Sequence, residues 1–484
     1  MNQKTLSYYA PAPQVLGLDS GTQSVLDELW AQWVAKMPRN WTRTLYLDAK
    51  NQFKDLEVSL PPSIVDKLNV VFGWAEKSVY ELSNRIVLES ITSPEEDSDP
   101  FGLKKTLHRN QFWAELRSAT ASSLAYSTVF VSVSQGDVSR REPEELVMFH
   151  SALYATGLWD NRLRDMTAAL IINKVDALGT PTQATLMLPQ ETLVMYGGDG
   201  RWVLGSRVVN PTGRLLFHQL PYRPTLDRPF GKSRIDRPTM SLMDRAVRSE
   251  ARLDVHSELF MMVKLMLMGA GQNTFLDADG KTIPLWSFMA GRVNGIPKDE
   301  DGDIPKLEVI QSQSPDPHIK NTEHIASIFS GHTGVPLRNL GVTSQSNPES
   351  ADAQRVGRED IVNDAENQQL IFDTPLRSVF EDIVMLREGL TEPPPEMLDL
   401  ALQWRRPDRI SLAALADAGA KQVASGPDAL RESEVGMEML GMSRSQIERF
   451  QSEKRRSQSG SLLDRVLQAR AVEPVEGASD GDAA

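Results

Sequence analysis

Apolar residues recur at three- and four-residue steps over long parts of the N-terminal third of the chain. Residues 22–37 (TQSVLDELWAQWVAKM), 62–91 and 112–126 (FWAELRSATASSLAY) all show this spacing. Such spacing places the apolar side chains on one face of a helix, so each stretch predicts an amphipathic helix. The run SPEEDSDP, with its prolines and acids, interrupts the pattern after the second stretch. The first third is therefore expected to be mainly helical.

The middle third changes to alternating and β-branched runs, which are typical of strands. The clearest runs are STVFVSVSQGD at 127–137, TAALIINKV at 167–175, ATLMLPQETLVMY at 184–196 and RWVLGSRVVN at 201–210. Short turn sequences separate them, which favours antiparallel pairing. Helices beside such a region predict an α+β fold.

Helical spacing returns after Pro238. It predicts one long helix over 239–268 and a second over 317–333. A third is expected to begin with Asn347 as its cap and Pro348 at its first position, and to run to about Arg387. Pro375 lies inside this third helix and is expected to kink it. A smaller helical segment is expected over 397–456, and the small, acidic residues 471–484 predict disorder.

Composition and charge narrow the function classes. The chain has 484 residues and no cysteine, which excludes disulfide frameworks, cysteine-ligated zinc and thiol nucleophiles. Its formal net charge of -13 argues against tight binding of nucleic acid through released counterions. The most apolar run, 259–268, is interrupted by Lys264 and is half the length of about 20 residues that a membrane span needs. No secretion signal or membrane span is expected.

Candidate catalytic and metal-binding motifs fail on their spacing. The string GKS at 231–233 would need a glycine five residues before Gly231 to form a phosphate loop, but the chain has Leu226 there. The acidic clusters at 277–279 and 299–303 have their glycine in the wrong place for a calcium loop and lack its closing glutamate, so hairpin turns are favoured. His318, His324 and His332 do not share the helix face that zinc ligands need. A protein without enzymatic activity, cofactor or metal is expected.

The predicted helix 239–268 separates its charges by sign. Like charges recur at a spacing of four residues, which costs a few tenths of a kcal/mol for each pair in an isolated helix. Two interpretations stay open: a solvated helix, or an interface that closes a ring by laying the basic side of one copy against the acidic side of the next. The basic side contains Arg245, Arg248 and Arg252, and the acidic side contains Glu250, Asp254 and Glu258.

Four segments in the same order resemble the portal proteins of tailed bacteriophages, in the SPP1-like portal family. They are VVFGWAEKSVYELSNRIVLESI, FWAELRSATASSLAYSTVFVSVS, PYRPTLDRPFGKSRI and TGVPLRNLGVTSQSNPESADAQR. The resemblance runs from about residue 20 to residue 460. The chain departs from the family at Lys232, where related chains often carry arginine, and after Arg140, where the usual markers are missing.

The resemblance implies a portal fold and a homododecameric ring at one capsid vertex of the virion, assembled in the host cytoplasm. Double-stranded DNA would pass through the ring during packaging and genome ejection, without recognition of its sequence. The implied partners are the terminase large subunit, a head-tail adaptor, the major capsid protein and a scaffold protein. The implied parts are a wing of helices and antiparallel strands (1–238), two stem helices (239–268 and 317–336), an α/β clip (269–316), a tunnel loop (337–347), a long kinked helix (348–390) and a helical crown (391–470).

The tunnel loop would face DNA. It is nearly uncharged, which fits sliding, because many basic loops around a duplex would hold its phosphates firmly. Amides and hydroxyls can touch phosphates without reading sequence. An ordinary helix connector is the alternative for the loop, and a subunit of a DNA-processing enzyme or another phage ring, such as a collar or baseplate component, is the alternative for the protein. The predicted DNA-facing residues are Arg338, Asn339, Thr343, Ser344, Gln345, Ser346 and Asn347.

Overall fold

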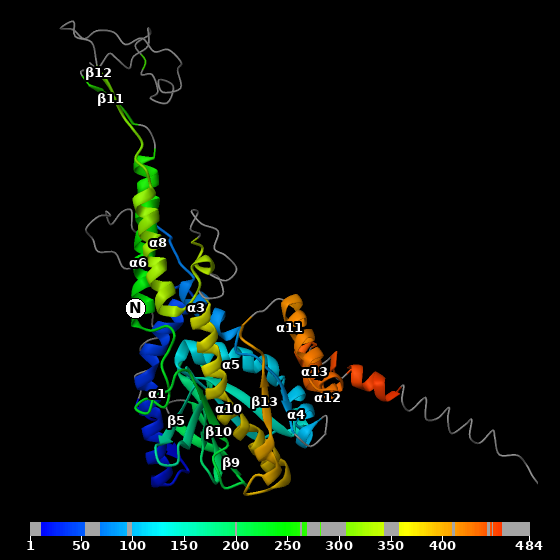
Figure 1. Cartoon of the computed structure of the whole chain (residues 1–484). Coiled ribbons are helices and arrows are strands. Elements are labelled where there is room, and N and C mark those ends of the chain that lie inside the picture. The colour runs from blue at the N-terminus through cyan, green and yellow to red at the C-terminus, as the bar shows by residue number, and fades with distance from the viewer. Residues whose placement is uncertain are drawn as a thin grey trace, which may run out of the picture.

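The computed structural model shows a body of mixed helices and sheets from which a helical hairpin stands out like a stalk (Figure 1). It describes residues 11–53, 68–93, 99–198, 201–261, 264–268, 281, 306–342, 358–408, 412–442, 446–447 and 449–456. Helices and mainly antiparallel sheets occupy separate layers of the body, so the predicted α+β class is confirmed. None of the described helices combines the length and apolarity needed to cross a bilayer.

A long N-terminal helix covers one face of a six-stranded sheet. Helix α1 (Ser20–Leu47) is capped by Asp19, whose carboxylate accepts from the backbone N–H of Thr22 at 2.9 Å. Trp30 and Trp33 of α1 are buried against the sheet, and the ring of Trp30 meets that of Trp202 edge to face. The sheet order is β1-β9-β8-β7-β6-β5, formed by Val15–Leu16, Arg201–Val209, Glu191–Gly198, Pro181–Met187, Asp165–Val175 and Ala155–Asp160.

A second core forms around a three-stranded sheet in the order β10-β3-β4. Its strands are Phe217–Pro221, Thr128–Gln135 and Glu145–Ser151. Helices α3 (Trp74–Ser83), α5 (Phe112–Tyr126) and α10 (Glu359–Glu388) contribute buried apolar residues to the same core. The shorter α4 (Leu103–Arg109) packs beside α5. Segments from both halves of the chain therefore share one core.

The stalk is a pair of helices with a strand ribbon at its tip (Figure 1). Helix α6 (Arg237–Phe260) leads upward and α8 (Asp316–Thr333) returns beside it. Between them, β11 (Lys264–Met268) and β12 (Lys306–Ile310) pair antiparallel. After α8 comes a 3₁₀ turn, η6 (Leu337–Leu340), and the chain re-enters the body as α10.

Three predicted helices differ from the structure. The expected helix over 239–268 is wrong at its end, because α6 stops at Phe260 and 264–268 pair as strand β11. The expected helix over 62–91 is too long at both ends, because 68–73 are not helical, α3 covers only Trp74–Ser83, and 88–92 form strand β2 (Leu88–Thr92). Its partner is β13 (Ala401–Trp404), in a region that the sequence predicts as helical. Both segments are strands because they pair with each other across more than 300 residues, and the local spacing of apolar residues does not reveal such a partner.

Other predicted elements agree with the structure within a few residues. Helix α5 has the predicted bounds, and α8 begins one residue earlier than predicted. Helix α10 continues through Pro375, while residues 348–357, where its predicted cap and first turns fall, lie outside the described part. In the crown region, α11 (Leu412–Ser425), α12 (Asp428–Glu432) and α13 (Glu434–Met439) are helical. Most of the predicted clip, apart from residues 281 and 306–316, and the whole C-terminal tail also lie outside the described part.

Candidate functional site

The stalk helices hold each other through a narrow apolar seam with a polar lock. Met243 and Ala246 of α6 are buried, as is Phe329 of α8, whose ring lies 5.3 Å from that of Trp74 in the body. Higher up, the buried Ser249 Oγ receives hydrogen bonds from Asn321 Nδ2 at 2.8 Å and Thr322 Oγ1 at 3.0 Å. These contacts fix the rotation of α6 against α8, and so decide which side of each helix stays exposed.

The charged residues predicted as an interface remain outside this seam. Arg245, Asp254 and Glu258 are exposed, whereas Arg248, Glu250 and Arg252 are half-buried. Partial burial raises the pKa of Glu250, and the nearby negative charge of Asp254 raises it further. This repulsion within one copy is the one that the four-residue spacing predicts. Arg245, Asp254 and Glu258 thus remain on the surface of the stalk.

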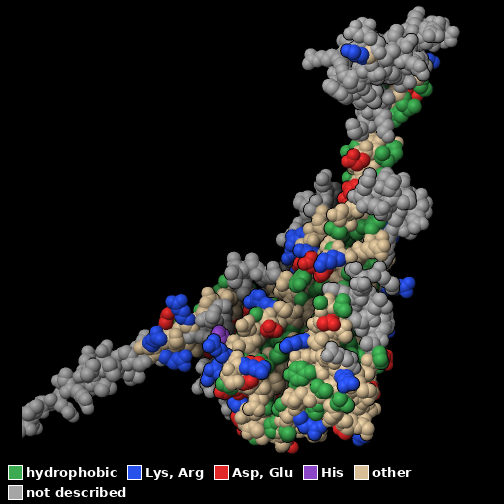
Figure 2. Space-filling view, turned by 180° about the vertical axis from the view of Figure 1, so that it is seen from behind, with side chains coloured by type: hydrophobic (Ala, Val, Ile, Leu, Met, Phe, Trp, Pro, Cys, Tyr) green, Lys and Arg blue, Asp and Glu red, His purple; other side chains and the backbone are tan. Residues whose placement is uncertain are grey.

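The upper end of the stalk carries apolar side chains in the open. Leu259, Phe260 and Met261 are each more than 40% exposed. The ribbon above adds exposed Met266 and Ile310, and Figure 2 shows apolar side chains beside the undescribed tip. A two-stranded ribbon is at best marginally stable alone. Exposed apolar side chains therefore gather at the upper end of the stalk.

His318 and His332, which are near each other in the sequence, contact different residues in the structure. The rings of His318 and His256 lie 5.0 Å apart, and burial together with the neighbouring His256 lowers the pKa of His318. His332 instead lies 3.0 Å from the carboxylate of Asp236, which caps α6. His324 joins neither contact. No group of three or more potential metal ligands occurs among the described residues.

The predicted tunnel loop is described only at its start. Pro336 precedes η6, in which Leu340 is buried and anchors the turn. Arg338 is exposed and Asn339 is half-buried. The other predicted DNA-facing residues, Thr343, Ser344, Gln345, Ser346 and Asn347, lie outside the described residues.

A buried arginine joins the base of the stalk to the body. Arg234 Nη1 donates to Asp364 Oδ2 at 2.8 Å and to the hydroxyl of Tyr222 at 2.9 Å. Its Nε donates to the carbonyl of Ser78 in α3 at 2.7 Å, and its Nη2 donates to the carbonyl of Thr333 at the end of α8. We name Arg234, Asp364 and Tyr222 the stalk anchor. It connects α3, α8 and α10 through a single side chain.

Arg223 and Tyr222 make the remaining contacts with the carboxylate of Asp364. Asp364 Oδ1 accepts from Arg223 Nε at 2.9 Å, and Oδ2 also accepts from the Tyr222 hydroxyl at 2.9 Å. Burial raises the pKa of Tyr222 to about 12, so its hydroxyl keeps the proton that it donates. Arg234 is 6% exposed, and a charge so buried needs such partners.

The GKS string is part of the same structural unit. Ser233 is buried and donates to the carbonyl of Ala125 at 2.5 Å, while the N–H of Lys232 donates to the carbonyl of Tyr222 at 2.8 Å. Gly231 has a φ of +70°, and a Cβ there would lie 2.2 Å from the Tyr222 carbonyl oxygen. The string therefore closes a tight turn that positions Arg234, in agreement with the failed phosphate-loop spacing.

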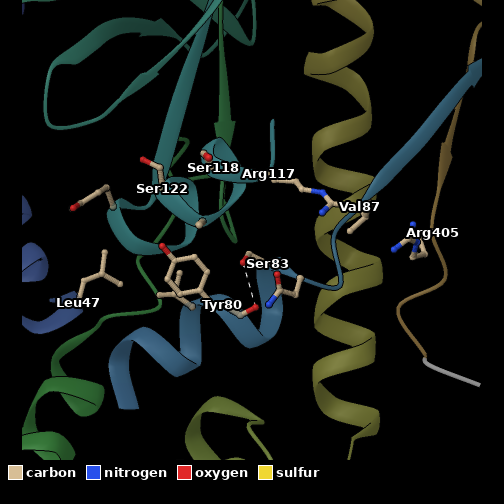
Figure 3. Close-up of a pocket in the computed structure, with 12 residues that line it drawn as sticks. Leu47, Tyr80, Ser83, Val87, Arg117, Ser118, Ser122 and Arg405 are labelled. Carbon is tan, nitrogen blue, oxygen red and sulfur yellow. Dashed lines mark hydrogen bonds between the residues drawn. The ribbon is translucent and has the colours of Figure 1, made fainter. Parts of the chain in front are cut away.

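A polar pocket of about 440 Å³ opens between α3, α5 and the segment after β13 (Figure 3). In Figure 3, Arg117 points toward Val87, and Arg405 comes from the segment that follows β13. Tyr80 and Ser122 lie at the other end. The lining has hydroxyls and guanidinium groups but no carboxylate or imidazole. A hydroxyl here has no general base to activate it as a nucleophile.

One hydroxyl–imidazole pair does exist in the body. Ser132 Oγ and His150 Nε2 are 2.8 Å apart. Both side chains sit between strands β3 and β4, and burial lowers the pKa of His150 to about 4. Ser132 is 5% exposed and lies next to the stacked rings of Phe130 and Phe217. The pair is a packed contact of the core.

The structure brings the predicted stem residues onto one stalk but leaves the stalk anchor unpredicted. Arg234 and Asp364 are 130 residues apart, and no spacing rule connects them. The available signal was the segment PYRPTLDRPFGKSRI, which contains Tyr222, Arg223 and Arg234 together. An arginine and a tyrosine inside an otherwise turn-forming segment are candidates for a buried polar network.

The chain is similar to curated portal proteins of mycobacteriophages. It is 23% identical over 413 residues to the portal protein of Mycobacterium phage L5, covering 82% of this chain and 81% of the relative. It is 27% identical over 254 residues to the portal protein of Mycobacterium phage D29, covering 52% of this chain and 51% of that protein. No family model matches the chain.

Among solved structures, the chain is similar to a chain in the neck of the native GTA particle computed with C12 symmetry. The TM-score is 0.40 at 13% identity, over 82% of this chain and 98% of the other. A chain in the neck of the empty GTA particle, computed with C6 symmetry, gives a TM-score of 0.42 at 14% identity, over 81% and 97%. TM-scores of this size do not by themselves establish a shared fold.

Replacing one carboxylate oxygen of Asp364 by an amide nitrogen should lower the stability of the protein strongly. Asp364→Asn removes the charge that neutralises the buried Arg234, so the free energy of unfolding should fall by roughly 3–5 kcal/mol. Urea titration followed by tryptophan fluorescence measures it. Asp373→Asn, on the same helix, is the matched control: its half-buried pair with Arg377 should contribute less than about 1 kcal/mol. Equal losses in the two variants would contradict the role of the anchor.

Proposed function

We propose that this chain is a portal protein, the subunit of a ring that forms a channel for DNA at one vertex of a phage capsid. The observation that carries the proposal is the similarity to the L5 portal protein, which extends over 82% of this chain. The four segments that resemble the SPP1-like portal family contain α3 with most of β2, α5 with most of β3, Tyr222 and Arg234 of the stalk anchor, and η6. We extend the proposal to that branch.

The geometry of the stalk supports a ring. A lone subunit would expose the apolar upper end of the stalk and a two-stranded ribbon that needs further packing. Neighbouring copies around an axis would cover both. A dodecamer is the stoichiometry that the family resemblance implies.

Ring closure would use the charged sides of α6. The basic side, with Arg245, Arg248 and Arg252, would face the acidic side of the next copy, with Glu250, Asp254 and Glu258. This contact is head-to-tail and closes only if each copy turns by the same angle. Opposite charges across the interface would relieve the repulsion that raises the pKa of Glu250.

DNA would pass along the axis beside the loop that follows α8. The DNA-facing residues would be Arg338, Asn339, Thr343, Ser344, Gln345, Ser346 and Asn347. With one cation for each copy, this loop would give weak, sequence-independent contact that permits sliding. The body would serve as the wing, α6 and α8 as the stem, the ribbon region as the clip, and α11–α13 as part of the crown.

The ring would be a structural component of the virion with no catalysis of its own. ATP hydrolysis for packaging would come from a terminase large subunit docked on the clip, which later receives a head-tail adaptor. The wing would contact the major capsid protein and a scaffold protein. The exposed apolar residues beside the ribbon suit such exchange of partners.

Imaging of the purified protein tests the proposal directly. Negative-stain electron microscopy should show rings with a central hole and rotational symmetry, with twelve-fold symmetry as the expected order. Incubation with ATP should release no phosphate. A compact monomer or dimer, or nucleotide turnover by the chain alone, would sink the portal assignment and favour the enzyme alternative. Rings whose stalks do not line the hole would favour a collar or baseplate component.

Charge reversal tests the stem interface. Arg248→Glu places two acidic sides against each other and should reduce the ring fraction several-fold, measured by analytical ultracentrifugation at low salt, where charge screening is weakest. Arg248→Glu combined with Asp254→Arg should restore most of it. Thermal unfolding of each variant controls for misfolding. If the double variant assembles no better than the single one, the two residues do not meet across subunits.

Added charge tests the loop. Gln345→Lys with Asn347→Lys adds two cations for each copy near the duplex, and the firmer hold on phosphates should slow packaging and ejection by an order of magnitude or so. Gln345→Ser with Asn347→Ser is the neutral control and should behave as the parent. Packaging rates in a reconstituted system measure the effect. Unchanged rates in the lysine variant would count against a DNA-facing loop.

A further inference from the structure

The buried seam between α6 and α8 ends below the top of the stalk. Both helices are described over their whole length, and the last buried residue of α6 is Ala251, while the first of α8 is Ile325. The two helices nevertheless continue side by side above these residues (Figure 1). Contacts between their upper parts therefore come from side chains that are exposed or half-buried.

Two histidines meet across the helices above the seam. The ring of His256 on α6 and that of His318 on α8 have centres 5.0 Å apart and planes inclined by 57°. Two imidazoles that bind one metal ion through nitrogens at about 2.0–2.1 Å have ring centres about 4.5–5.2 Å apart, for bond angles between a right angle and the tetrahedral angle. The two rings are thus separated as a pair of ligands on one ion would be.

A backbone carbonyl determines which nitrogen of His256 can bind an ion. His256 Nε2 lies 3.2 Å from the carbonyl oxygen of Gln313. Because a carbonyl oxygen only accepts, Nε2 of the neutral ring carries the hydrogen and Nδ1 keeps its lone pair. The N–H of Gln313 donates to the carbonyl of Phe260 at 2.9 Å, which holds this part of the backbone against the end of α6. A fixed carbonyl of this kind orients metal-binding histidines in proteins.

His318 keeps both ring nitrogens open. Neither nitrogen has a hydrogen bond within the described part of the chain, where the ion pairs of histidine involve His218 and His332 instead. Burial and the neighbouring His256 and Arg252 lower the pKa of His318. The ring is therefore neutral at pH 7, which is the form that binds a metal ion.

The surroundings of the pair define the class of ion. Imidazole nitrogens suit Zn²⁺, Ni²⁺ and Cu²⁺, whereas Mg²⁺ and Ca²⁺ take oxygen ligands. The described residues hold no group of three or more potential ligands, so two protein nitrogens are available here. The ring of Phe260 lies 5.4 Å from that of His256, and the positive charge of Arg252 near His318 opposes a cation. Binding should therefore be weaker than at a structural site with four protein ligands.

We propose that His256 and His318 form a binding site for one divalent transition-metal ion, Zn²⁺, Ni²⁺ or Cu²⁺, which clamps α6 to α8 above the buried seam. Nδ1 of His256 and one ring nitrogen of His318 give their lone pairs to the ion, and water fills the other positions. The ion joins the helices at a level where neither helix buries a side chain, so it stiffens the upper stalk. The site lies within one chain and does not depend on ring formation.

Calorimetric titration of the chelator-treated, full-length protein with ZnCl₂ measures the site. The parent should bind one ion for each chain with a saturable isotherm. His256→Ala and His318→Ala should each weaken binding by at least about tenfold, because one imidazole cannot chelate. His324→Ala is the matched control, since this histidine is also on α8 but exposed and outside the pair, and it should bind as the parent does. Thermal unfolding of the zinc-free variants controls for folding.

Electron paramagnetic resonance with one equivalent of Cu²⁺ identifies the ligands. The spectrum of the parent and of His324→Ala should show coupling to two imidazole nitrogens, and the spectrum of His256→Ala to one. A parent that binds Zn²⁺ no more tightly than the double variant His256→Ala with His318→Ala has a contact between two rings and no metal site. An equal loss of affinity in His324→Ala would also overturn the proposal.

Hydrogen exchange tests the clamp. Saturating Zn²⁺ should slow amide exchange several-fold in peptides that cover 252–260 and 316–322 of the parent, because opening of the upper stalk then has to break the metal bonds. The same peptides of His318→Ala should show no change. Unchanged exchange in the zinc-bound parent would overturn the clamp. These measurements stand apart from the portal assignment, since they give the same answer in rings and in single chains.

Discussion

A guanidinium buried between three helices must be neutralised and hydrogen-bonded on every side, and Arg234 meets this demand with groups from α3, α8, α10 and the strand end at Tyr222. The contacts are directional, so they specify how the stalk leaves the body as well as holding it there. A purely apolar junction of the same size would stabilise the contact without specifying one angle so strictly. In the proposed ring each stalk would meet identical stalks around an axis, and this angle would decide whether they fit together.

The stalk leaves apolar and charged side chains exposed along its upper part. Its seam buries small and apolar residues on one side only, and leaves like charges and apolar residues exposed toward the tip. In a monomer these features would lower stability or solubility. In the proposed ring they become contacts between copies, so the same residues that weaken one stalk would support the assembly. The ribbon is a similar case, because it has two strands among the described residues and an independently stable sheet needs three or more.

Local sequence determined the helices and strands whose buried residues recur at a regular spacing along the chain. Helix α5, strands β6, β7, β8 and β9 of the six-stranded sheet, helix α8 and the failure of GKS as a phosphate loop all follow from residue order over fewer than 20 positions. Tertiary structure decided the rest: that 264–268 leave the helix, that 88–92 pair with 401–404, and that Arg234 meets Asp364. Those outcomes depend on partners tens to hundreds of residues away. The physical reason is that an apolar run gains equally from burial in a helix or a strand, and only the neighbour that covers it selects between them.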